Sequence, residues 1–174
     1  MRPVINVWSL SNVLNTDTGI FVMFGAAIAP VMEKIYGKDH TAVVLLLILI
    51  IIHDWIMGIA ASIKDRTYSS EYGIKGIFRT IYICLYPALG NFIDYVLGTP
   101  GFLFHAITFG LIYHYWKSGV ANAARAGLDK WIPESIIRLV ESEIQAKAMR
   151  ALERQAYLEE RIEILSKQKK KEEN

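Results

Sequence analysis

Residues 41–63 read TAVVLLLILIIIHDWIMGIAASI, and this stretch decides the fold. Its first half, residues 42–52, is an unbroken run of Ala, Val, Leu and Ile, which soluble helices rarely contain. A helix of this length crosses a bilayer core of about 30 Å with some tilt. We therefore expect a membrane-spanning helix that carries one carboxylate, Asp54, past its midpoint.

The overall composition agrees with residence in a membrane. The 174 residues are 53% hydrophobic, and the mean hydropathy is +0.28, whereas soluble domains normally lie below zero. A formal charge of +2 is too small to indicate nucleic-acid binding. The one cysteine, Cys84, cannot form an internal disulfide. No cleavable signal peptide is expected, because the first residues lack a positive cluster followed by a compact apolar core.

Three further segments predict membrane helices: residues 19–36, 77–97, and 102–116 or beyond. Residues 1–18 fit either a short helix at the membrane surface or a frayed terminus. Lys64 and Arg66 lie between the second and third spans, and the turn at residues 98–101 is uncharged. The positive-inside rule then places both termini in the cytoplasm. The predicted fold is an all-α integral membrane domain of about four spans over residues 19–124; a three-span form, with residues 19–36 bound only to the surface, is the alternative.

The last part of the chain, residues 125–174, has a soluble composition. Pro133-Glu134 predicts the start of a helix that reaches about Gln168, with apolar residues at spacings of three and four and charges on the other faces. This long amphipathic cytoplasmic helix can pack on copies of itself, on the membrane surface or on a partner. The basic tail, residues 167–174, is expected to be disordered and to lie near the anionic inner leaflet.

Asp54 is the sharpest functional signal. A carboxylate near the middle of a span costs roughly 2.5–3.5 kcal/mol on insertion scales, so it is expected to be protonated, paired, or facing water or another helix. It would line a pore or form an inter-helix hydrogen bond that sets assembly; hydration at the interface is the alternative. His53, Asn91 and Asp94 are further candidates for a pore-lining or assembly surface, and for Asp94 interfacial hydration is an equal alternative.

Small residues allow helices to approach closely in lipid. Those expected at helix contacts are Gly25, Ala29, Gly58, Ala61 and Gly90. The sequence contains no metal-ligand spacing, nucleophile motif, phosphate loop or dinucleotide fingerprint. We therefore expect neither an enzyme nor a bound cofactor or metal.

Several short motifs follow one another along the chain. They are Asp54-x-x-x-Gly58-x-x-Ala61, then Ser69-Ser70-x-x-Gly73-x-Lys75-Gly76 in a loop, Asn91-x-x-Asp94, Asn122-Ala123-Ala124-Arg125-x-Gly127, and Ile132-Pro133-Glu134. Together they resemble the toxin-secretion/phage-lysis holin family over about residues 19–145. The resemblance implies a homo-oligomer in the host cytoplasmic membrane that opens lesions at a timed point in lysis. An endolysin or a toxin would pass through them, and an antiholin is a further candidate partner.

Two other readings of the sequence remain open. The chain would be a membrane adaptor or regulator if its C-terminal helix binds a partner and no lesions form. It would be a small proton-coupled transporter if Asp54 is a proton site.

Overall fold

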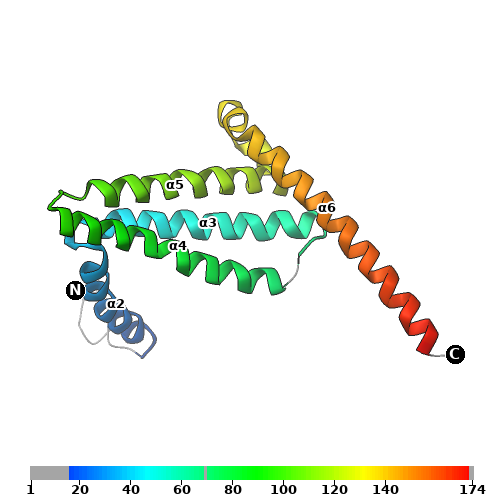
Figure 1. Cartoon of the computed structure of the whole chain (residues 1–174), viewed down its shortest axis with the longest axis horizontal. Helices are drawn as coiled ribbons and strands as arrows, with labels where there is room; N and C mark the ends of the chain where they lie inside the picture. The colour runs from blue at the N-terminus through cyan, green and yellow to red at the C-terminus, as the bar shows by residue number, and fades with distance from the viewer. Residues whose placement is uncertain (1–15, 69, 173–174) are drawn as a thin grey trace, which may run out of the picture. The chain divides into compact units, whose positions relative to one another are not determined.

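The computed structural model describes residues 16–68 and 70–172. These residues form helices and no strands, which confirms the all-α prediction (Figure 1). The chain divides into two compact units, the first ending at Ala42 and the second beginning at Val43.

The first unit contains α2, Thr16–Tyr36, and the short helix η1, Lys38–His40. The predicted span at residues 19–36 thus corresponds to one helix, which begins three residues earlier and holds Pro30 inside it. Gly37 separates the two helices with a φ of 93°, a conformation that glycine adopts readily. The predictions for residues 1–15 lie outside the described part of the chain.

Helix α3, Thr41–Lys64, belongs to the second unit from Val43 onward and matches the span predicted at residues 41–63. Its buried positions Val44, Leu47, Ile51 and Asp54 recur at spacings of three and four, so they lie on one face of the helix. Arg66 ends α3 with a left-handed φ of 55°. Thr67 N donates to the Ser62 carbonyl at 2.9 Å, as in a Schellman motif.

Helix α4, Ser70–Leu97, begins seven residues before the predicted span. The prediction that the motif of residues 69–76 lies in a loop is therefore wrong from Ser70 onward, since Gly73, Lys75 and Gly76 lie within the first turns of α4. The reason is local: an acidic first turn favours a helix start, and a glycine costs only about 1 kcal/mol inside a helix. Pro87 lies inside the helix, which continues beyond it to Leu97.

A tight turn connects α4 to α5, Phe102–Ala123. Gly98 ends α4 with a φ of 68°, and Thr99 N donates to the Asp94 carbonyl at 2.9 Å. The sequence predicts a helix over residues 102–116 or beyond, and α5 extends beyond residue 116 to Ala123. A π-helical turn, η2 (Ala124–Leu128), and a 3-10 turn, η3 (Asp129–Trp131), follow it.

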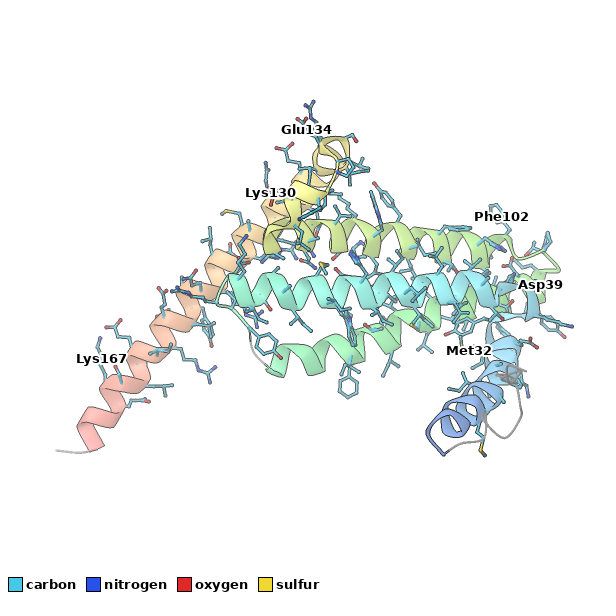
Figure 2. All side chains as sticks on the ribbon, turned by 180° about the vertical axis from the view of Figure 1, so that it is seen from behind. Met32, Asp39, Phe102, Lys130, Glu134 and Lys167 are labelled. Carbon is cyan, nitrogen blue, oxygen red and sulfur yellow. The ribbon has the colours of Figure 1, made fainter. Side chains whose placement is uncertain are left out.

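Helix α6, Glu134–Glu172, starts directly after Pro133, as the sequence predicts. The amides of Ile136 and Ile137 donate to the Pro133 carbonyl. The prediction of a disordered tail from Lys167 is wrong as far as Glu172, because the helix continues through the lysines. Figures 1 and 2 show α6 crossing one end of α3 and α5 and extending past them, with Lys167 on the extended part.

The core of the second unit draws on three helices. Leu47 and Ile51 of α3 pack with Tyr115 of α5, and Ile83 and Cys84 of α4 lie against them. The outer faces of α3 and α4 carry large apolar side chains that are about half exposed or more: Leu45, Leu49, Ile56, Ile63, Phe78, Ile81, Leu85, Leu89 and Phe92. Among the described residues, two helical segments, Lys38–Lys64 and Gly76–Leu97, are long and apolar enough to cross a membrane.

Candidate functional site: a buried polar network

Asp54 lies on the buried face of α3 and is only 6% exposed. Two side chains of α5 donate to its Oδ1, the Ser118 hydroxyl at 2.7 Å and the Asn122 amide at 2.9 Å. These donors are four residues apart, so they project from one face of α5. A carboxylate removed from water requires such donors. The polar contact between α3 and α5 is therefore centred on Asp54.

Lys147 of α6 reaches the same two α5 residues. Its ammonium group donates to Ser118 Oγ at 2.7 Å, to Asn122 Oδ1 at 2.9 Å and to the Ser118 carbonyl oxygen at 3.2 Å. An ammonium group has three protons, and this arrangement uses all of them. Burial lowers the pKa of Lys147 below its usual value, while the negative charges of Asp54 and Glu143 oppose that shift. Lys147 is thus a partly buried cation, and either of two α5 side chains, Ser118 or Asn122, lies between it and Asp54.

Asn122 connects the carboxylate to two cations. Its NH₂ group donates to Asp54, and its carbonyl oxygen accepts from Lys147 and, at 3.3 Å, from Arg125 Nη1. Arg125 also forms an ion pair with Asp65, which directly follows α3. Two carboxylates and two basic groups give a formal charge of zero. We call this set the Asp54 network: Asp54, Asp65, Ser118, Asn122, Arg125 and Lys147.

Small residues allow the helices that carry the Asp54 network to approach one another closely. A Cβ at Gly58 would lie 3.3 Å from Asn122 Nδ2, so α3 passes directly beside the amide. Ala61, one turn later, is fully buried. Gly127 in η2 has a φ of 97°, and a Cβ there would lie 3.1 Å from Lys64 Nζ. This left-handed position turns the chain directly after Arg125.

Asp94 belongs to a separate site, at the N-terminus of α5. It is 2% exposed, and its carboxylate accepts from the backbone amides of Leu103 at 3.1 Å and Phe104 at 2.7 Å. The Thr99 hydroxyl donates to the same carboxylate. Asp94 therefore caps α5 from the end of α4, where a negative charge also meets the positive end of the α5 dipole.

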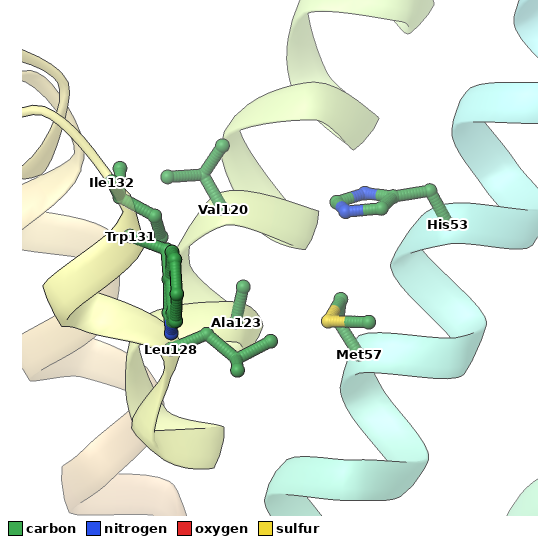
Figure 3. A pocket seen from close by; sticks show the side chains of 7 residues that line it. All are labelled: His53, Met57, Val120, Ala123, Leu128, Trp131 and Ile132. Atoms are coloured by element: carbon green, nitrogen blue, oxygen red, sulfur yellow. The ribbon is translucent and has the colours of Figure 1, made fainter.

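His53, the residue before Asp54, is exposed and lines an apolar groove of about 440 Å³ (Figure 3). Met57 lies beside it on α3, and Trp131 and Leu128 form the opposite wall. The other lining residues are Val120, Ala123 and Ile132. His53 and Asp54 are thus neighbours in sequence that serve different surfaces.

The remaining predicted packing residues fall in different surroundings. A Cβ at Gly90 would lie 3.0 Å from Phe104 Cα, so α4 and α5 cross closely there. Asn91 is partly buried on α4, three residues before Asp94. In the first unit, Gly25 and Ala29 are exposed, and nothing lies within 4 Å of a Cβ built at Gly25.

The family-motif residues also divide between sites. Asn122 and Arg125 belong to the Asp54 network, and Pro133 accepts the first hydrogen bonds of α6. Ser70 is the first residue of α4. Ser69 lies outside the described residues.

Three network members, Asp65, Ser118 and Lys147, were not singled out from the sequence. One signal pointed to Lys147: it lies on the same stripe of α6 as Val140, Ile144 and Ala151, at helical spacings of three and four. Ser118 gave no such signal. Within residues 16–68 and 70–172, no three His, Cys, Asp or Glu side chains are grouped to hold a metal ion.

Comparison with known proteins places the chain in a family. It is 32% identical over 94 residues to the uncharacterized proteins Lmo0128 of Listeria monocytogenes and Lin0175 of Listeria innocua. Each alignment covers 54% of this chain and 66% of the relative. No solved structure matches. The model of the bacteriophage holin family matches residues 30–142, which include all of α3, α4 and α5. That match spans more than half of the chain, and this membrane protein therefore belongs to the bacteriophage holin family.

Proposed function

We propose that this protein is a holin, which oligomerises in the host cytoplasmic membrane and opens lesions at a timed point in host cell lysis. The observation that carries the proposal is the family match over residues 30–142. The lesions would release an endolysin, or a toxin, to the cell wall. An antiholin is a further candidate partner, and the protein itself catalyses no reaction.

The topology that we propose has four spans, formed by α2, α3, α4 and α5, with both termini in the cytoplasm. Lys64 at the end of α3 and Arg66 after it support a cytoplasmic turn, and the many charges of α6 support a cytoplasmic C-terminus. The uncharged turn at residues 98–101 would then face outward. This arrangement places Lys147 on the cytoplasmic side.

The Asp54 network supports a resting state that is stable in lipid. In a single copy the carboxylate is buried against α5 and its charge is balanced within the chain, while the apolar faces of α3 and α4 point outward. Opening a lesion requires these helices to exchange partners among copies. We propose that Asp54 and Asn91, with His53, then face water or neighbouring copies, while Asp94 supports the assembly by keeping its cap on α5. The small residues Gly25, Ala29, Gly58, Ala61 and Gly90 would permit close packing.

The test is induced expression in a bacterium, with membrane potential followed by a voltage-sensitive dye. We expect an abrupt collapse of the potential after a fixed delay, and release of cytosolic enzyme when an endolysin is co-expressed. A membrane potential that persists although the protein is present in the membrane would contradict the proposal. For the network, Asp54→Ala should change the delay or abolish collapse, because it leaves two α5 donors unpaired. The matched control is Asp129→Ala, which removes an exposed carboxylate from η3.

The outer part of α6 favours a second candidate function, a membrane adaptor or regulator. Beyond its contact with α5, the helix exposes large apolar side chains at Leu152, Tyr157, Ile162 and Leu165. An adaptor would use this surface for a partner and would leave the membrane potential intact. The same induction experiment therefore separates the two functions.

A further inference from the structure

Helix α6 contacts the bundle through its first half. Val140 is fully buried, and Lys147 makes three hydrogen bonds to α5. By contrast, residues 159–168 are all exposed. The family match ends at residue 142, so Lys147 lies beyond it. We propose that Lys147 is a positioning residue that holds α6 on α5 through the Asp54 network, and that its withdrawal is the step that frees Asp54 for lesion opening.

Lys147 lies on the face of α6 that packs against the bundle. Val140, Ile144, Lys147 and Ala151 follow one another at spacings of four, three and four, so all project toward the same side of α6. A lysine on a packed face is costly because its charge leaves water. It is stable there only when its protons are bonded, and all three are. The exposed Arg138, on the same helix, has no such requirement.

Withdrawal of Lys147 changes the electrostatic surroundings of Asp54. Ser118 and Asn122 each join the two charged groups, since each donates to Asp54 and accepts from Lys147. When Lys147 leaves, the carboxylate keeps its two donors but loses a balancing charge. A buried ion without its counter-charge is strongly disfavoured. Undocking of α6 therefore favours any helix arrangement in which Asp54 reaches water.

The contact between α6 and α5 is noncovalent, and it involves the first half of α6. No covalent bond or large apolar core holds the outer part of α6, whose side chains are mostly exposed. Contact with a partner or with other copies through that part can therefore shift the docking equilibrium. The proposal rests on the proposed holin function for its consequence, but the docking itself does not depend on it.

The experiment compares wild type, Lys147→Met and Arg138→Met as full chains in lipid nanodiscs. Lys147→Met keeps the side-chain length and removes the charge; Arg138→Met removes an exposed charge from the same helix. We expect amide hydrogen exchange over residues 136–151 to rise about tenfold or more for Lys147→Met. In Arg138→Met, exchange over residues 136–151 should stay at the wild-type value. In both variants, exchange over the core of α3 to α5 should also stay at the wild-type value. Wild-type exchange in Lys147→Met would overturn the proposal, and so would faster exchange throughout the bundle.

A double-variant cycle shows whether Lys147 acts through Asp54. Asp54→Asn removes the charge that Lys147 balances. The effects of Asp54→Asn and Lys147→Met on the hydrogen-exchange rate of residues 136–151 should therefore be clearly less than additive. Lys147→Arg keeps a positive charge, so its amide hydrogen exchange over residues 136–151 should be slower than that of Lys147→Met. In cells, Lys147→Met should collapse the membrane potential earlier than wild type, and an unchanged delay would overturn the role in opening. If wild type never collapses the potential, the holin function fails, whereas the exchange results still decide whether the docking contact exists.

Discussion

Replacement of Asp94 should destabilise the fold by weakening the start of α5. The carboxylate accepts from two amides of the first α5 turn, those of Leu103 and Phe104, and from the Thr99 hydroxyl. At 2% exposure, water does not replace these bonds in the folded state. Loss of an N-terminal cap costs about 0.5–2 kcal/mol, and a hydrogen bond to a charged group contributes about 1.5–3 kcal/mol. We therefore expect Asp94→Ala to lower the free energy of unfolding by about 2–3 kcal/mol.

A graded set of variants separates the contributions at this cap. Asp94→Asn keeps one acceptor oxygen and loses the charge, so it should cost about 1 kcal/mol. Thr99→Val removes only the hydroxyl donor and should cost less than Asp94→Asn. The free energies come from reversible unfolding in mixed micelles, followed by circular dichroism at increasing fractions of denaturing detergent. If Asp94→Ala and Thr99→Val agree to within about 0.5 kcal/mol, the carboxylate does not cap α5.

The remaining predictions concern packing and the basic tail. Gly90→Ala should destabilise the protein by about 1–3 kcal/mol in the same assay, because its Cβ would press on the backbone of Phe104 at 3.0 Å. Gly119→Ala should cost less even though its Cβ would lie 2.6 Å from His53 Nδ1, since an exposed ring can rotate away; equal losses would contradict this contrast. Deletion of residues 167–174 should shift the delay before membrane collapse, and replacement of its four lysines by glutamine should shift it equally if attraction to anionic lipid is the cause.

The sequence predicted the elements well because their signals are local. The apolar run of residues 42–52 is sufficient to place α3, and Pro133-Glu134 is sufficient to place the start of α6. The errors were also local: residues 70–73 contain a glycine and polar residues, which are typical of a loop, yet a favourable helix start extends α4 through them. The lysines from residue 167 onward predict a disordered tail, but Lys is a good helix former and the helix continues through them.

The candidate site was predicted only in part, because its partners are distant in sequence. Asp54 was evident, since a carboxylate inside an apolar helix needs an explanation. Its donor Ser118 lies 64 residues away and Asn122 68 residues away, and no spacing rule connects them to α3. The role of Asp94 was missed for a similar reason. Only the folded turn at residues 98–101 brings the first amides of α5 to its carboxylate.

The contrast between the two buried aspartates has a functional consequence. Asp94 bonds to backbone amides that belong to the next helix in the chain, so its partners stay with it as long as α5 remains folded. Asp54 depends on side chains from α5 and, through them, on Lys147 of α6. Rigid-body movement of α5 removes the two donors, and movement of α6 removes Lys147, in both cases without unfolding any helix. A membrane protein that must remain closed and then open can therefore use the Asp54 network as its changing contact while the Asp94 cap keeps α4 and α5 joined. Variants of Asp94 should accordingly alter stability more than timing, and variants of Lys147 should alter timing more than stability.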